Sequence, residues 1–255
     1  MIFTEKELFE FLELKYLQYN HLSFIETDPV SIPHQFTLKE DIEISGFLTA
    51  TISWGKRKSI LNAANKLMHL MDLAPYDFIL NAGKHDLERL EKFYYRTFNQ
   101  EDCIYFIRSL QNIYRNHGGL RNLFSAMNET GIKQALGVFR STFLSPEHPR
   151  HAEKHIPDPF AGSSAKRMQL FLRWMVRKDG RGVDFGIWPE ISPSQLLIPL
   201  DVHSGRVARK LGLLTRKTND WKAAEELTAR LRIFDPEDPV KYDFALFGLG
   251  IFEGF

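Results

Sequence analysis

The chain has 255 residues, of which 44% are hydrophobic and 13% aromatic, so the composition excludes an intrinsically disordered protein. Lys and Arg number 33 and Asp and Glu 32, for a formal net charge of +1. The single cysteine, Cys103, excludes a disulfide within the chain and any metal or iron–sulfur centre held by cysteines alone. No apolar run approaches the roughly 20 residues of a membrane helix, and acids appear early, so we expect no signal peptide and a cytoplasmic protein.

The charges are unevenly distributed along the chain. Residues 1–50 hold three bases and nine acids, residues 51–150 hold 14 and nine, residues 151–217 hold 12 and six, and residues 218–255 hold four and eight. A basic middle between acidic ends is compatible with one basic face that binds nucleic acid. The alternative is that these charges are solvated on helix faces pointing in many directions.

Apolar residues recur at helical spacing along almost the whole chain. Helices are predicted to begin at the capping boxes Thr4–Glu7 and Thr37–Glu40, at Ser59, at Asn99, at Ser163 or Ser164, and at Ser192 and Asp238, each of which precedes a proline. Further helices fit residues 203–213, 220–231 and 239–250. The predicted loops are residues 19–36, 72–84, 142–162 and 178–191. The pattern predicts an all-α globular fold rather than a simple up-and-down bundle.

The histidines and the cysteine favour structural interpretations. His148, His151 and His155 are the closest histidines in sequence, but prolines interrupt their segment, so a solvated loop is favoured over a metal site. We therefore expect no metal and no cofactor. Cys103 falls on the apolar side of its predicted helix and is expected to be a buried thiol.

The segment from Leu200 to Leu213 places an acid before a basic helix. Asp201 stands at the predicted helix start, and Arg206 and Arg209 follow within the helix. Asp201 either caps this helix and interacts with its dipole, or is an acid placed beside a positively charged, ligand-binding face.

A second segment combines a Gly-Ser-Ser turn, residues 162–164, with the start of a predicted helix. The N–H groups at a helix start suit a phosphate, and the dipole there disfavours the protonated form of Lys166. The alternative is an ordinary exposed lysine. A third segment, residues 242–250, is an apolar helix with small residues, which by itself indicates core packing.

Together these segments resemble the helix–hairpin–helix DNA glycosylase superfamily. Residues 200–213 (LDVHSGRVARKLGL) are similar to its VDTHVxRVxxRLGL segment, and residues 46–67, 162–174 and 244–250 resemble its early helix pair, its hairpin with the following helix, and its closing helix. The blocks KRMQLFLRWMVRKDG and IPLDVHSGRVARKLGL resemble more closely an uncharacterised bacterial family, carried as a domain of unknown function, over nearly the whole chain.

The resemblance implies a glycosylase-like unit over residues 1–255 with a cleft between two helical subdomains and no iron–sulfur cluster. Residues 40–140 would form the central subdomain, and residues 1–39 with 141–255 the terminal one, which carries the hairpin and LDVH segments. The implied partner is damaged duplex DNA in the bacterial cytosol, without a membrane. The sequence leaves the oligomeric state open, and a monomer is expected.

The resemblance also implies a mechanism. Asp201 occupies the position of the acid that stabilises a cationic sugar, and Lys166 is the candidate for the lysine that attacks C1′ and forms a Schiff base, after the damaged base is flipped out of the duplex. Trp54 falls in the turn where superfamily members place a residue that enters the gap; a core position is the alternative. The residues implied to contact DNA are Gly162, Ser163, Ser164, Arg167, His203, Arg206, Arg209, Trp54, Lys56 and Arg57.

Two departures from the superfamily matter. IPDPFAGSSAKRM replaces the usual LPGVGxxTA hairpin, and Lys166 lies 35 residues before Asp201, farther than in the resembling enzymes. The insertion KDGRGVDFGIWPEIS must fold away if the two are to meet. Phe171, Trp174 and Trp188 are aromatic enough to stack on a flipped base, although core positions are favoured. The alternatives to a glycosylase are a DNA- or RNA-binding module of the same fold and an unrelated helical enzyme or interaction protein with a chance LDVH match.

Overall fold

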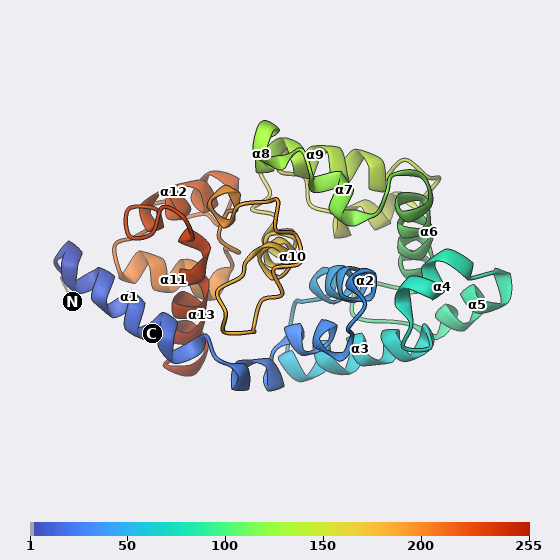
Figure 1. The fold of residues 1–255 in the computed structure, drawn as a ribbon, viewed down its shortest axis with the longest axis horizontal. Coiled ribbons are helices and arrows are strands. Elements are labelled where there is room, and N and C mark those ends of the chain that lie inside the picture. Colours follow the sequence, from blue (N-terminus) through green and yellow to red (C-terminus); the bar gives the residue numbers. More distant parts are fainter. Residues whose placement is uncertain (1–2) are drawn as a thin grey trace. The chain divides into compact units, whose positions relative to one another are not determined.

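The computed structural model describes residues 3–255, which form α-helices and short 3₁₀ helices and no strand (Figure 1). The predicted all-α class is confirmed. Met1 and Ile2, which open the segment in which we expect no signal peptide, lie outside the described residues. The chain divides into two compact units: unit 1 is Met1–Phe24 with Pro159–Phe255, and unit 2 is Ile25–Asp158. None of the helices in residues 3–255 is both long enough and apolar enough to cross a membrane.

Unit 1 is built from both ends of the chain. Its helices are α1 (Glu5–Tyr19), α10 (Lys166–Val176), α11 (Val202–Lys210), α12 (Trp221–Leu231) and α13 (Asp243–Phe252), with 3₁₀ helices η6 (Pro193–Gln195) and η7 (Pro239–Tyr242). Helix α13 packs against α1 and α11 (Figure 1). The close approach to α1 depends on Gly248, because a Cβ at this position would overlap the Tyr19 ring.

Unit 2 contains the central part of the chain. Its α-helices are α2 (Lys39–Thr51), α3 (Arg57–Leu70), α4 (Pro75–Asn81), α5 (Lys84–Arg89), α6 (Gln100–Asn116), α7 (Leu120–Phe124), α8 (Met127–Thr130) and α9 (Ile132–Phe143). Its 3₁₀ helices are η2 (Pro29–Ser31), η3 (Pro33–Gln35), η4 (Leu90–Lys92) and η5 (Arg150–His155), and η1 (Leu22–Thr27) spans the boundary between the units. The core contains a cluster of packed phenylalanine rings, Phe47, Phe106, Phe139 and Phe143.

Local sequence signals predicted some helix starts and missed others. The capping box of α1 at Thr4 is confirmed, and the helix predicted to begin at Asn99 starts there with a capping box of its own. The helix predicted after Thr37 is present as α2. The predicted capping box at Thr37 is wrong, because the residue before the helix is Leu38, which makes no side-chain cap. The Ser192-Pro193 pair opens only the three-residue helix η6.

The helix predicted to start at Ser163 or Ser164 begins later, at Lys166. Ala165 precedes it in a left-handed conformation with φ 51° and provides no side-chain cap. Ser163 Oγ instead accepts a hydrogen bond from the Ala165 N–H at 3.2 Å, outside the helix. The loop predicted over residues 72–84 is also wrong in part, because it contains α4 with Pro75 in its first turn. The loop over residues 178–191 is confirmed.

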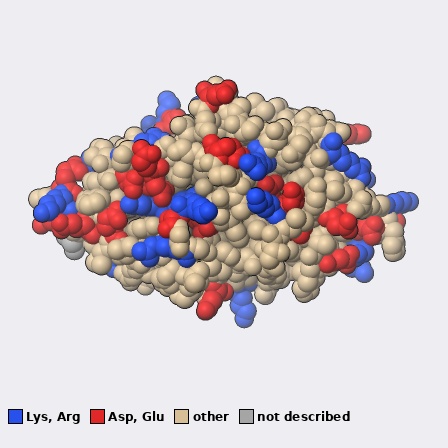
Figure 2. All heavy atoms as spheres, in the orientation of Figure 1, with Lys and Arg blue, Asp and Glu red and all other residues tan. Residues whose placement is uncertain are grey.

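The charge imbalance along the sequence disappears when the charges are counted by unit. Unit 1 holds 17 Lys and Arg against 16 Asp and Glu, and unit 2 holds 16 of each. The acidic C-terminal segment supplies partners to the basic middle, as in the pair of Arg177 with Asp238 at 2.7 Å. Basic and acidic side chains are interspersed on the face that Figure 2 shows. The basic middle of the sequence is therefore not a basic unit of the fold.

Candidate active site

Asp201 caps helix α11 with one of its carboxylate oxygens. Its Oδ1 accepts hydrogen bonds from the backbone N–H groups of His203 at 2.8 Å and Ser204 at 2.9 Å, and Ser204 Oγ accepts one from the Asp201 N–H at 2.9 Å. Asn219 Nδ2 donates to the Asp201 carbonyl oxygen at 2.9 Å. The helix start and the loop after α11 therefore hold the carboxylate in one orientation. The interpretation of Asp201 as a cap is correct, and capping occupies only Oδ1.

The other carboxylate oxygen faces Lys166, the first residue of α10. Lys166 Nζ lies 3.5 Å from Asp201 Oδ2, although the two residues are 35 positions apart in the sequence. Their side chains remain 29% and 21% exposed, so a ligand can reach the pair. An accessible amine beside a fixed carboxylate can attack an electrophilic carbon and stabilise positive charge that develops there.

The turn before α10 places Lys166 at this position. Gly162 has φ +90°, which favours glycine, and its carbonyl oxygen accepts a hydrogen bond from the Trp221 N–H at 2.9 Å. Ser164 Oγ donates to the carbonyl oxygen of Leu200, the residue before Asp201, at 3.5 Å. The turn is thus attached to the start of α12 and to the segment that leads into Asp201.

The segment of residues 178–191, which lengthens the separation, folds back onto α10. The Phe185 N–H donates to the Trp174 carbonyl oxygen at 2.8 Å. Trp188 packs edge-on against Phe171 with ring centroids 5.4 Å apart. Phe171, Trp174 and Trp188 are fully buried, so their interpretation as core residues is confirmed.

Beyond Lys166, the buried side of α10 carries polar residues. Gln169 and Arg173 follow Lys166 at helical spacing, and Arg177 comes directly after the helix; all three are almost completely buried. Both polar atoms of the Gln169 amide lack a hydrogen-bond partner. A helix that only had to pack would place apolar residues here, so this polar row is a candidate functional feature.

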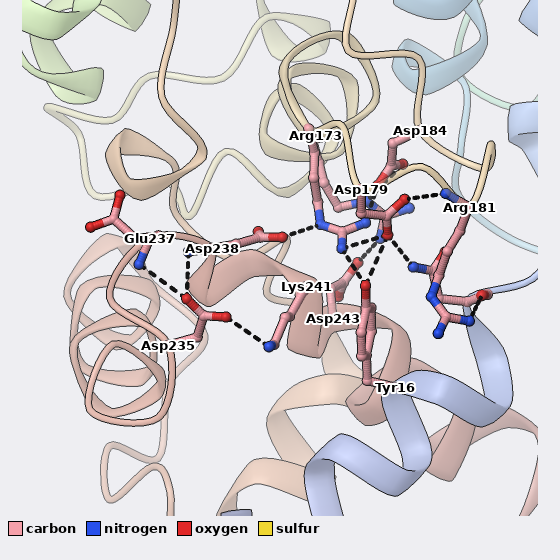
Figure 3. A network of polar contacts seen from close by, with 12 residues as sticks. Tyr16, Arg173, Asp179, Arg181, Asp184, Asp235, Glu237, Asp238, Lys241 and Asp243 are labelled. Carbon is pink, nitrogen blue, oxygen red and sulfur yellow. Dashed lines mark hydrogen bonds and ion pairs between the residues drawn. The ribbon is translucent and has the colours of Figure 1, made fainter.

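The two arginines lie in a buried network with four aspartates (Figure 3). Arg173 binds Asp184 at 3.3 Å and also binds Asp243. Arg177 binds Asp184 at 3.0 Å, Asp238 at 2.7 Å and Asp179 at 2.8 Å. We call Arg173, Arg177, Asp179, Asp184, Asp238 and Asp243 the buried network.

Asp243 joins the buried network to the Lys166–Asp201 pair. Its side chain is 8% exposed, and burial raises its pKa to about 6. Arg173 and Lys166 oppose this rise, whereas the charge of Asp201 adds to it. Sequence reasoning missed Asp243, because one acid at the start of an apolar helix is indistinguishable from a surface residue. The signal was the pair of arginines on the apolar side of α10, which require buried acids as partners.

The predicted DNA-contacting bases of unit 1 have different environments. Arg206 is exposed and donates to the Gly250 carbonyl oxygen at 3.2 Å. Arg209 donates to Asn219 Oδ1 and to the Arg216 carbonyl oxygen, both at 2.6 Å, so it supports the loop that holds Asp201. Arg167 is half-buried, and burial lowers the pKa of its guanidinium to about 10. Among all the predicted DNA-contacting residues, His203, Ser164 and Arg209 take part in the hydrogen bonds around Asp201. Arg209 does so through Asn219, which donates to the Asp201 carbonyl oxygen.

Trp54, Lys56 and Arg57 belong to unit 2. The Trp54 ring packs edge-on against Tyr95 at 5.3 Å and stacks against His155 at 5.9 Å, measured between ring centroids. Lys56 precedes helix α3 and Arg57 is its first residue, so both stand at a helix N-terminus. All three residues belong to one short segment of unit 2, and the Trp54 ring packs against other residues of that unit.

The histidine segment is not the solvated loop that the sequence predicted. His151 Nε2 and His155 Nε2 lie 3.2 Å and 3.3 Å from the two carboxylate oxygens of Asp102, which is fully buried. The prediction was wrong for His155, because η5 packs against the start of α6 and leaves that side chain 3% exposed. In the described part of the chain, no group of three or more His, Cys, Asp or Glu is arranged to hold a metal ion. Cys103 is buried, as predicted.

Comparison with known proteins identifies a protein family. The model of a family described as Protein of unknown function (DUF2400) matches residues 28–252. No curated protein and no solved structure matches the chain. The matched range contains Lys166, Asp201 and Asp243 and agrees with the expected resemblance to an uncharacterised family over nearly the whole chain. The wider resemblance to DNA glycosylases stays a prediction.

Proposed function

This chain belongs to the DUF2400 family of proteins of unknown function, and we propose that it is a DNA-repair glycosylase that removes a damaged base from duplex DNA. The observation that carries the proposal is the 3.5 Å approach of Lys166 Nζ to Asp201 Oδ2 across 35 residues of sequence. The resemblance to helix–hairpin–helix glycosylases assigns a role to each of these two residues. It would be fortuitous for both to meet at the surface of an unrelated fold.

In the proposed reaction, the flipped nucleotide places its C1′ atom beside the Lys166–Asp201 pair. The carboxylate of Asp201 stabilises the positive charge that the sugar develops as the C1′–N bond breaks. The Lys166 amine then attacks C1′. As the C1′–O4′ bond breaks, O4′ takes up a proton from the amine and the opened sugar is left as a Schiff base, which gives the enzyme lyase activity. The turn of residues 162–165 takes the place of the hairpin, and helices α10, α11 and α13 follow in the order that the resemblance implies.

The charge distribution supports a specific site more than a general nucleic-acid-binding module. Both units carry nearly equal numbers of bases and acids, so long-range attraction to phosphates is weak. Duplex binding would then depend on local groups such as the exposed Arg206 and Lys56. A binding module without catalysis remains the second candidate, and it predicts salt-dependent binding without base release.

The decisive experiment is borohydride trapping on duplexes that contain 8-oxoguanine, uracil, an alkylated purine or an abasic site. We expect a covalent adduct with the wild-type protein and none with Lys166→Gln. Lys178→Gln is the matched control, because Lys178 is an exposed lysine after the same helix. An adduct that persists in Lys166→Gln would remove this lysine from the proposal, and the absence of adduct and base release on every duplex would favour the binding module.

Asp201→Asn tests the second residue without removing the helix cap, because asparagine caps helices as well as aspartate does. We expect base release to fall by a factor of at least about 100, the usual effect of losing an electrostatic stabiliser of the transition state, with duplex binding retained. If activity survives, Asp201 is only a cap.

A further inference from the structure

The buried network holds more acids than bases. Two guanidinium groups, those of Arg173 and Arg177, face four carboxyl groups, those of Asp179, Asp184, Asp238 and Asp243. Asp184 and Asp243 are almost fully enclosed, whereas Asp179 and Asp238 are 12% and 21% exposed. Unbalanced charge is costly in the enclosed part, and a carboxyl group there can remove it by keeping its proton. The composition of the network therefore favours a protonated carboxyl group within it.

Asp243 is the member of the buried network that is coupled to the Lys166–Asp201 pair. Arg177 keeps the pKa of Asp179 at about 2 against the effect of burial, so Asp179 is ionised. Burial also raises the pKa of Asp238, but the charges that act on it are those of Arg177, Asp184 and Asp235, not those of the Lys166–Asp201 pair. Asp243 binds Arg173 through Oδ2 and feels the charges of both Lys166 and Asp201. The proton of the network and the reacting groups thus meet at this residue.

Asp201 and Asp243 differ in the way that paired carboxyl groups of glycoside-cleaving enzymes differ. Asp201 is partly exposed, and its Oδ1 accepts two backbone N–H bonds. Asp243 is enclosed, with a guanidinium on one oxygen. A partly exposed carboxyl group that faces a lysine and an enclosed one can provide a charge stabiliser and an acid, respectively, for breaking a glycosidic bond.

We propose that Asp243 is the general acid that protonates the departing base, and that the substrate is therefore a neutral damaged base rather than a cationic alkylated one. This rests on the proposed glycosylase function. As the C1′–N bond breaks, its electron pair stays with the base, and the Asp243 proton passes to an acceptor atom of that base. The sugar becomes a cation beside Asp201, and the Asp243 carboxylate regains a proton from water.

One face of helix α10 connects Lys166 to the arginine that binds this acid. Lys166, Gln169 and Arg173 lie on one face of α10 at spacings of three and four residues. The buried Gln169 amide, which has no hydrogen-bond partner, offers a donor and an acceptor between the other two. Gln169, Arg173 and Asp243 are almost fully buried, so in the proposed complex a base whose sugar lies at Lys166 must displace the packing around them to reach Asp243.

The ionisable groups around Asp243 come from all the elements that pack near the start of α13. They are Lys166 and Arg173 of α10, Asp184 of the following loop, Asp201 before α11, Tyr16 of α1 and Lys241 of η7. Tyr16 and Lys241 bind acids other than Asp243: the Tyr16 hydroxyl donates to Asp179, and Lys241 pairs with Asp235. Arg173 is therefore the direct partner of the Asp243 carboxyl group.

The test compares neutral and cationic leaving groups in single-turnover base release. The probes are duplexes with uracil, hypoxanthine or 8-oxoguanine as neutral bases and 7-methylguanine as a cationic base. We expect the wild-type protein to release a neutral base at a rate that falls as the pH rises above about 6. Asp243→Asn should lower that rate at least about 100-fold, the lower range for losing a general acid, and abolish the fall with pH.

Two controls separate catalysis from structure. Asp184→Asn changes the other aspartate that Arg173 binds, so it perturbs the buried network while Asp243 stays in place, and the fall with pH should persist. Borohydride trapping on an abasic duplex needs no protonation of a base, so Asp243→Asn should form the adduct at the wild-type level. Asp243→Glu should recover part of the lost rate.

Each outcome bears on one proposal or on both. The general-acid role is overturned if Asp243→Asn keeps the wild-type rate on neutral bases, loses rate without a change in pH dependence, or loses trapping on abasic DNA as well. It is also overturned if the wild-type protein releases only 7-methylguanine. If the wild-type protein neither releases a base nor forms an adduct, the proposed function fails and this inference fails with it.

Discussion

Asp102 in unit 2 and Asp243 in unit 1 are both buried aspartates in the first turn of a helix, yet their surroundings shift their pKa values in opposite directions. Burial raises the pKa of each, but hydrogen bonds from His155 and the Asn99 N–H bring the pKa of Asp102 below its ordinary value. Asp243 has Arg173 as its partner, and its pKa remains raised, at about 6. Asp102 thus contributes stability as a carboxylate, whereas Asp243 costs stability when it ionises.

The difference separates an acid whose charge stabilises the fold from the acid that we propose for catalysis. Asp102 completes the capping box of α6 with Asn99 and binds two imidazoles, so the fold uses its charge. Asp243 makes no side-chain cap for α13, because Tyr242 is the residue before that helix and forms none. A buried acid whose ionisation costs stability is retained at a cost, and perturbed groups of this kind gather at functional sites.

The largest expected effect is in unit 2. Asp102→Ala removes the hydrogen bonds that the buried carboxylate accepts from His155 and from the Asn99 N–H, each worth about 1.5–3 kcal/mol, and should lower the free energy of unfolding by about 3–5 kcal/mol. Urea unfolding at pH 7 measures it. Because the folded pKa is lowered, this advantage of the wild type should shrink as the pH falls below the ordinary carboxyl range. Glu101→Ala, at the exposed neighbour, should change stability by less than about 0.5 kcal/mol.

Asp243→Asn should show the opposite pH dependence. The wild-type carboxyl has a folded pKa of about 6 against an ordinary 3.8, so the native state holds the proton more tightly and is stabilised at low pH. Between about pH 4 and pH 6 the wild type should lose about 3 kcal/mol relative to Asp243→Asn, and the difference should stay constant above that range. Urea unfolding of both proteins at pH 4.5, 5.5, 6.5 and 7.5 measures it. A constant difference across this series would mean that Asp243 is ionised throughout, like Asp102.

The smallest expected effect concerns the capping box at Asn99, which has no counterpart at the start of α13. Asn99→Ala removes the side chain that accepts the Asp102 N–H at 3.0 Å and should cost about 1 kcal/mol of unfolding free energy. Asn116→Ala, at the exposed end of the same helix, is the matched control, and we expect it to leave the unfolding midpoint almost unchanged. Equal losses in the two variants would show that the capping box adds nothing to the role of Asp102.

Local signals in the sequence predicted individual helices better than they predicted which distant segments pack and pair with one another. Thr4 and Glu7 form the predicted capping box because both belong to one turn, and their interaction needs no other part of the fold. The basic middle of the sequence did not predict a basic unit, because the acidic ends fold into unit 1 and supply counterions such as Asp238. Charge counted along the chain says little about charge on a surface when distant segments pair.

The sequence by itself determined the all-α class, the cap at Asp201 and the candidate lysine, because helix periodicity, capping and a motif are local properties. Only the tertiary structure decided that Lys166 meets Asp201. The insertion between them folds back onto α10, and the turn at Ser164 binds the residue before Asp201. It also decided that Asp243 joins them, because the pKa of a carboxyl group depends on burial and on charges that are distant in the sequence.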